Sequence, residues 1–167
     1  MLTRRATFST LFIGGTTMAG LGSLFGGGPK DHGDENFPVK KSEADWKKQL
    51  SPESWHVLRE HGTERAGTSP LDHEKRKGTF VCMGCDKKLF ASGAKFNSGT
   101  GWPSFFDTLP GAVATTEDTK FFMRRVEVHC ADCGGHLGHV FEDGPKPTGL
   151  RYCMNGVSLK FAPDAGA

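Results

Sequence analysis

The fold is decided by Cys82-Met83-Gly84-Cys85 and Cys130-Ala131-Asp132-Cys133, two stretches with 44 residues between them. A two-residue gap places two thiolates on one face of a tight turn, and we expect Gly84 and Gly134 to provide the backbone freedom required. Four thiolates complete a tetrahedral shell with no open position, so the stretches predict a structural Zn²⁺ site that joins two distant hairpins. Two disulfides or a redox pair are the alternatives, but redox motifs seldom occur twice on one small domain.

The segments around these cysteines have the pattern of short strands. Residues 126–130 and 157–161 alternate between apolar and polar side chains, as half-buried strands do. Ahead of them, Ser42 and Ser51 each stand where a helix N-cap is expected, with an acidic residue in the following turn. We therefore predict a mainly β fold with antiparallel strands and one or two short N-terminal helices.

Length and charge narrow the class of protein. The 167 residues suit a single domain, and 13 Phe beside one Tyr indicate an aromatic core. The 21 Lys and Arg nearly balance the 19 Asp and Glu, and no basic block occurs. A nucleic-acid-binding protein needs such a block to neutralise phosphates, so we exclude nucleic acid as a partner.

Residues 1–28 differ in composition from the rest of the chain. Arg4 and Arg5 precede an apolar run that is diluted by glycine and carries no further charge before Lys30. This pattern resembles a twin-arginine export signal and predicts delivery to the periplasm. An uncleaved membrane anchor and a plain tail are the alternatives. We assign residues 29–41 to a linker, 42–163 to the domain and 164–167 to a tail.

The fifth cysteine is left over when four bind zinc. It lies in Arg151-Tyr152-Cys153-Met154-Asn155, where strand alternation places Arg151, Cys153 and Asn155 on one face. A nearby cation and hydrogen-bond donors favour the nucleophilic thiolate. An inert buried cysteine is the alternative interpretation.

Two further stretches contain residues suited to a site. In Gly134-Gly135-His136-Leu137-Gly138-His139-Val140-Phe141, the glycines disfavour a helix, so we expect His136 and His139 on a loop that runs into a strand. Packed histidines or zinc ligands are the alternatives there. Trp102 is held between Gly101 and Pro103 and could form the wall of an apolar pocket, with core packing as the alternative.

Together these stretches resemble the B family of methionine-R-sulfoxide reductases, whose sequence blocks occur here in the same order from about Trp46 to Phe161. The resemblance implies two antiparallel sheets joined by the zinc site, and reduction of the R epimer of methionine sulfoxide in oxidised proteins or peptides. It implies that Cys153 is the catalytic nucleophile and that Trp102 contacts the substrate methyl group. His136, His139 and Asn155 would shape and polarise the pocket, and we also assign Phe141 and Arg151 to substrate binding.

One residue departs from the family pattern. Many members carry a resolving cysteine between the two glycines where this chain has Thr100, and no other cysteine is spare. We expect Cys153 to become a sulfenic acid that an external small thiol or a thioredoxin-like protein reduces. His136 or His139 can supply the proton near neutral pH.

Two other functions remain as alternatives. A non-catalytic zinc-stapled module that binds a peptide or small ligand would need the zinc site and Trp102 but not Cys153. A Cys/His hydrolase would instead need donors arranged for an oxyanion. We predict a monomeric reductase.

Overall fold

The computed structural model describes residues 37–118 and 124–166. The predicted export signal at 1–28 and most of the predicted linker lie outside these residues. Among the described helices, none combines the length and the apolar character needed to span a membrane.

Two short helices begin where the sequence predicts. In α1 (Glu43–Gln49) and α2 (Pro52–Glu60), the hydroxyl oxygens of Ser42 and Ser51 accept hydrogen bonds from backbone N–H groups of the first turn. These bonds satisfy N–H groups that have no partner inside the helix. The helices bury Trp46 and Leu58 against the rest of the domain. At the end of α2, His61 adopts a left-handed conformation with φ of 55°.

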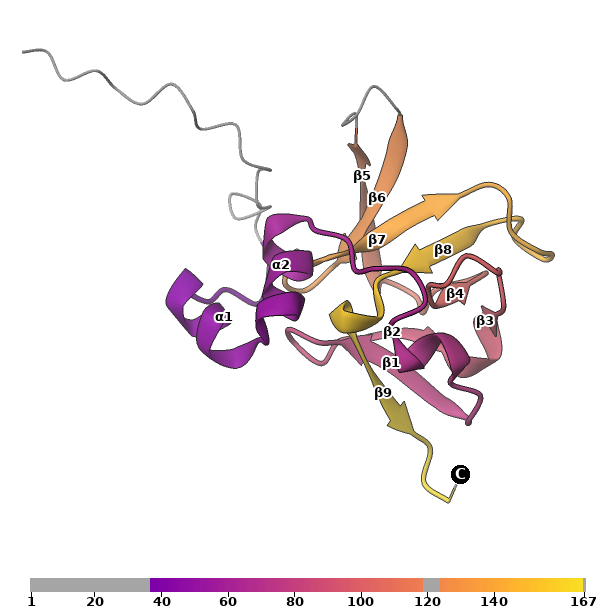
Figure 1. Cartoon of the computed structure of the whole chain (residues 1–167), viewed down its shortest axis with the longest axis horizontal. Coiled ribbons are helices and arrows are strands. Elements are labelled where there is room, and N and C mark those ends of the chain that lie inside the picture. Colours follow the sequence, from indigo (N-terminus) through magenta and orange to yellow (C-terminus); the bar gives the residue numbers. More distant parts are fainter. Residues whose placement is uncertain (1–36, 119–123, 167) are drawn as a thin grey trace, which may run out of the picture.

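The strands form two antiparallel sheets, which confirms the predicted fold class (Figure 1). The three-stranded sheet has the order β2-β1-β9, and the six-stranded sheet has the order β3-β4-β8-β7-β6-β5. The strand predicted at 157–161 begins only at Leu159, because a short 3-10 helix occupies Gly156–Ser158. The strands are β1 (Gly78–Cys82), β2 (Lys88–Ala91), β3 (Lys95–Phe96), β4 (Ser104–Phe105), β5 (Val113–Asp118), β6 (Arg125–Cys130), β7 (His136–Phe141), β8 (Arg151–Met154) and β9 (Leu159–Pro163).

An aromatic core lies between the sheets. Phe80 and Phe90 of the smaller sheet both contact Phe105 of the larger sheet, with ring centroids 4.9 and 4.3 Å apart respectively. All three rings are fully buried. Edge and offset ring contacts at these distances stabilise a core beyond the burial of apolar area. The phenylalanine-rich composition therefore indicates the core correctly.

The two cysteine stretches fold into matching turns. In each turn the N–H that follows the second cysteine donates to the carbonyl of the first, from Asp86 to Cys82 and from Gly134 to Cys130. Asp86 and Gly134 both adopt positive φ, 61° and 67°. The expectation for Gly134 is therefore correct. Gly84 is not among the positive-φ residues of the described chain, because Asp86 takes the left-handed position in the first turn.

The pairing of β7 with β8 leaves no room for a side chain at Gly138. A Cβ at this residue would lie 2.1 Å from the carbonyl oxygen of Cys153 in β8. We therefore expect Gly138→Ala to lower the free energy of unfolding by about 1–3 kcal/mol or more, since the strand backbone must move to admit the methyl group. Urea-induced unfolding measures the change.

Gly93→Ala is the matched control for this substitution. A Cβ at Gly93 meets no atom within 4 Å, so we expect a change of less than about 0.5 kcal/mol. Equal unfolding free energies for the two variants would contradict the tight pairing of β7 and β8.

Candidate active site and metal centre

The four cysteines of the matching turns come together in one cluster. Their sulfur atoms all lie within 4.8 Å of one another, with 3.7 Å between Cys82 and Cys133 and 3.5 Å between Cys85 and Cys130. A tetrahedral zinc ion with Zn–S bonds of about 2.3 Å separates its sulfur ligands by about 3.8 Å. A disulfide would need about 2.05 Å, and none of the four cysteines forms one. The cluster thus has the ligand set and the spacing of a metal site, and its geometry fits zinc.

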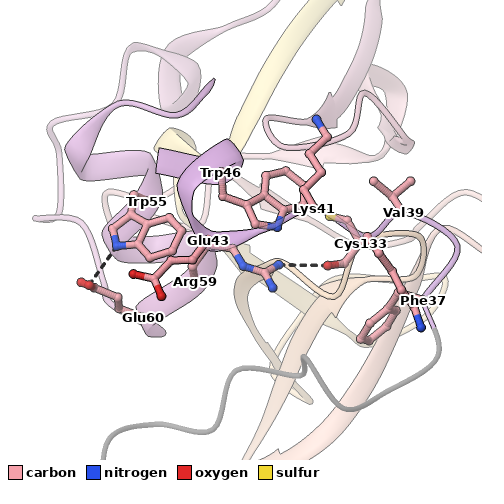
Figure 2. A pocket seen from close by; sticks show the side chains of 10 residues that line it. Phe37, Val39, Lys41, Glu43, Trp46, Trp55, Arg59, Glu60 and Cys133 are labelled. Atoms are coloured by element: carbon pink, nitrogen blue, oxygen red, sulfur yellow. Dashed lines mark hydrogen bonds between the residues drawn. The ribbon is translucent and has the colours of Figure 1, made fainter. Parts of the chain in front are cut away.

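Both helices contact this cluster. The Gln49 amide donates to the carbonyl of Gly84, and the Arg59 guanidinium donates to the carbonyl of Cys133 at 2.9 Å. A cavity of about 550 Å³ opens beside these contacts, and Figure 2 shows Trp46, Arg59 and Cys133 in its wall. None of the residues predicted to be catalytic lines it.

A smaller cavity surrounds Cys153. The strand β8 lies between β4 and β7, so Cys153 pairs with Ser104 on one side and with His139 on the other. The side chain of Cys153 is half-buried and lines a cavity of about 150 Å³. Five of the residues predicted from the sequence line this cavity, and three further residues complete it: Cys153, His139, Asn155, Trp102 and Phe141, with Thr63, Arg125 and Gly138.

The backbone of Glu64 forms hydrogen bonds to two side chains of this cavity, Trp102 and Asn155. Its backbone carbonyl accepts from the Trp102 indole N–H at 3.2 Å, and its backbone N–H donates to the Asn155 side-chain oxygen at 2.9 Å. The Asn155 amide also donates to the carbonyl of Leu137 at 3.0 Å. Burial raises the pKa of the Glu64 carboxyl, although it accepts backbone hydrogen bonds from Gly156 and Val157. These hydrogen bonds therefore fix the orientation of the Trp102 and Asn155 side chains.

His139 forms a pair with a carboxylate. Its Nε2 lies 2.9 Å from Asp118 of β5, and that carboxylate also accepts from Arg125 at 2.6 Å. Burial lowers the pKa of His139 below its ordinary value, and the neighbouring Arg125 and His136 act in the same direction. The hydrogen bond to Asp118 opposes them. The neutral imidazole is therefore favoured near pH 7.

His136 lies behind His139 and does not line the cavity of Cys153. Its ring meets that of His139 edge to face at 5.4 Å, and its Nδ1 lies 2.6 Å from the Glu127 carboxylate. His61 approaches the same Glu127 oxygen at 2.9 Å. Strand β7 begins at His136, so both histidines belong to the strand, whereas we expected a loop running into it.

Arg151 also lies outside the cavity lining. Its guanidinium stands 4.4 Å from the ring centroid of Phe141 and makes two hydrogen bonds to Asp143, at 2.8 and 2.9 Å. The hydrogen bonding to Asp143 raises the pKa of Arg151, and a weaker direct interaction of the guanidinium with Cys153 raises it further.

Thr100 stands beside the nucleophile candidate. Its hydroxyl oxygen lies 3.9 Å from the Cys153 sulfur and 2.8 Å from the hydroxyl of Ser98. Ser98 in turn contacts Ser104, whose hydroxyl donates to the carbonyl of Trp102. A chain of three hydroxyl groups thus leads away from Cys153.

The sequence did not single out His61, Asp118, Arg125 or Glu127 as residues of the site. Thr63 lies within the range from Trp46 to Phe161 over which the chain resembles the family, but its place in the cavity was not predicted. The charged residues on the alternating strand 125–130 were the available signal, since Glu127 is a buried carboxylate on a strand next to the histidines.

Comparison with known proteins agrees with the site. The SelR domain model matches residues 50–163. Proteins called peptide methionine sulfoxide reductase MsrB are similar to this chain over most of its length. The one from Agrobacterium fabrum is 56% identical over 75% of this chain and 93% of its own, and the one from Methanosarcina barkeri is 57% identical over 74% and 87%. The one from Leptospira interrogans is 53% identical over 75% of this chain and 97% of its own.

The extent of these matches, with four cysteines gathered in one cluster and Cys153 beside Trp102 and His139, leads to one conclusion. The chain belongs to the methionine sulfoxide reductase B family.

Proposed function

We propose that the enzyme reduces the R epimer of methionine sulfoxide in oxidised proteins or peptides, with Cys153 as the nucleophile. The observation that carries this proposal is the cavity in which Cys153 meets an indole, an imidazole and an amide. Membership of the family supports the substrate, and the preference for the R epimer rests on the family resemblance.

The proposed step transfers one oxygen atom between two sulfur atoms. The Cys153 thiolate attacks the sulfoxide sulfur and forms an S–S bond, and the oxygen takes up one proton. The oxygen then passes to the Cys153 sulfur as the S–O bond of the substrate and the S–S bond both break. The products are methionine and a sulfenic acid, so the substrate sulfur gains the two electrons that the cysteine sulfur loses. One proton must be delivered to the oxygen as it leaves.

His139 is the proposed proton donor. It lines the cavity, whereas His136 lies behind it. A histidine with a lowered pKa is a stronger acid once protonated, and it therefore gives up its proton more readily. Asp118 supports the imidazolium form that must exist before the transfer.

The remaining predicted residues have binding roles in this proposal. Trp102 and Phe141 would enclose the methyl group of the substrate, and the second N–H of the Asn155 amide, beside the one that donates to Leu137, would donate to the sulfoxide oxygen. Arg151 would act through Phe141, whose ring it covers, and through its direct interaction with Cys153.

Zinc is the proposed occupant of the four-cysteine cluster. Cys82, Cys85, Cys130 and Cys133 would hold it as thiolates, and with no open position the ion would serve stability. The proposed enzyme is a monomer whose sulfenic acid is reduced by a small thiol or a thioredoxin-like protein.

Export to the periplasm is also proposed. It rests on Arg4, Arg5 and the glycine-diluted run that follows them. A route that carries folded proteins would let the cysteines bind metal before they meet an oxidising compartment.

Replacement of a metal-binding cysteine should prevent the domain from folding stably. Structural zinc contributes about 10–16 kcal/mol in small zinc modules, more than the net stability of a typical domain. We therefore expect Cys85→Ser or Cys130→Ser to give insoluble or metal-free protein by metal analysis. Cys153→Ser is the control and should keep both zinc and fold. A folded, active Cys85→Ser or Cys130→Ser enzyme without metal would refute the zinc assignment.

The two cavity roles should separate in steady-state kinetics. Trp102→Ala should raise KM, because it removes methyl-group binding. His139→Ala should lower kcat by about 10²–10⁴-fold, because it removes proton supply. Trp55→Ala, a half-buried tryptophan in the wall of the other cavity, is the control and should change neither. Equal effects of the two cavity variants on both constants would contradict the assignment.

Recycling should need no second cysteine of this chain. After one turnover without reductant, a sulfenic-acid reagent should label Cys153 and mass spectrometry should find no new disulfide. Thr100→Cys should then form a disulfide with Cys153, since the Thr100 hydroxyl already lies 3.9 Å from that sulfur. A bridge from Cys153 to a cluster cysteine, with zinc released, would overturn this scheme.

A further inference from the structure

Three titratable side chains are buried together behind the active-site cavity. The side chains of His61, Glu127 and His136 are 5%, 9% and 3% exposed. They come from the end of α2, from β6 and from β7. Burying ionisable groups is costly unless each is paired, so a cluster of this kind needs a reason.

The spacing within this cluster is that of hydrogen bonds. One oxygen of Glu127 lies 2.6 Å from Nδ1 of His136 and 2.9 Å from Nδ1 of His61. Nitrogen and oxygen ligands about 2.1 Å from a tetrahedral metal ion would be about 3.4 Å apart. The distances therefore fit a carboxylate that accepts from two imidazole N–H groups, and they are shorter than the separation of ligands around a tetrahedral metal ion.

The backbone of His61 adds a second observation. A non-glycine residue with positive φ is uncommon, and glycine or asparagine usually stands there. Here the left-handed conformation turns the chain at the end of α2, and the imidazole that follows from it reaches Glu127. Strained residues persist where the surrounding structure holds them, often beside functional sites.

Two carboxylate–imidazole pairs thus lie side by side. Asp118 holds His139 at the cavity, and Glu127 holds His136 behind it, with the two rings edge to face. The Asp118 carboxylate also accepts a hydrogen bond from Arg125, whereas the Glu127 carboxylate has a second imidazole, that of His61, beside the same oxygen. His61, Thr63, Asp118, Arg125, Glu127, His136 and His139 line one small cavity of about 70 Å³.

We propose that Glu127 is a positioning residue. Together with His61 it keeps the proton of His136 on Nδ1 and thereby fixes the orientation of the His136 ring, which packs edge to face against His139. A carboxylate that accepts from Nδ1–H leaves Nε2 of a neutral imidazole as the acceptor, so the carboxylate selects the tautomer. This inference rests on the proposed role of His139 in proton transfer.

Glu127→Gln tests the tautomer directly. A glutamine carbonyl can take the place of the shared oxygen, but it is uncharged and holds the two N–H groups more weakly, and its NH2 group offers the imidazoles a donor that the carboxylate lacks. We expect long-range ¹H–¹⁵N correlation spectra of the wild-type enzyme to place the His136 proton on Nδ1. In Glu127→Gln this assignment should be lost or mixed. A wild-type His136 that carries its proton on Nε2 would overturn the proposal.

Kinetics give the second readout. We expect Glu127→Gln to lower kcat by about 10- to 1,000-fold with little change in KM, and Glu127→Asp to recover part of the loss. Glu117→Gln, an exposed residue of β5, removes the same charge away from the histidines and should leave kcat unchanged. A kcat for Glu127→Gln equal to that of the control, in a protein that retains its metal, would refute the positioning role.

His61→Asn separates positioning from packing. Asparagine tolerates the left-handed conformation, so the backbone at the end of α2 should keep its geometry while the imidazole is lost. We expect kcat to fall about 3- to 10-fold by the same reasoning, with no such fall for His56→Asn on the exposed face of α2. An unchanged kcat in His61→Asn would assign His61 to packing and contradict its part in the proposal.

Failure of the proposed function would look different. If His139→Ala retained full activity, the role of His139 would be wrong whatever the spectra of His136. If His139→Ala loses activity while Glu127→Gln and its control behave alike, only the positioning role is refuted.

Discussion

The four-cysteine cluster is the constraint on which the rest of the structure depends. Cys82 ends a strand of the smaller sheet and Cys130 ends a strand of the larger one, so a metal bound there would join the two sheets. Lys87 and Asp132 add an ion pair between the two turns. The aromatic core then closes the space between the sheets, because rings from both meet at Phe105.

The candidate site uses the middle of the larger sheet. Strand β8 has neighbours on both sides, so Cys153 has hydroxyl groups toward β4 and the imidazole of His139 toward β7. One side of the sulfur thus has small polar groups, and the other has a group that can hold a proton. A strand at a sheet edge would present its residue to one neighbour alone.

Local signals in the sequence identify much of this molecule, and non-local pairing decides the rest. The helix caps at Ser42 and Ser51 and the cysteine turns depend on residues within a few positions of each other, so they could be predicted. The partners of the histidines depend on the order β8-β7-β6-β5, which no local pattern specifies. Residues three apart on a regular strand point to opposite faces, yet His136 and His139 line one cavity. The register shift between Val128 and His129 in the pairing of β6 with β7 departs from that regular pattern.

The last turn of α2 connects two parts of the protein that are described separately above. Arg59 donates to the carbonyl of Cys133 in the metal cluster, and two residues later His61 reaches Glu127 behind the active-site cavity. One short segment of backbone therefore carries contacts to both centres. Energetic coupling between two sites is reciprocal by thermodynamic necessity. Any effect that a metal bound in the cluster had on substrate affinity through this turn would therefore be matched by an equal effect of substrate on metal affinity.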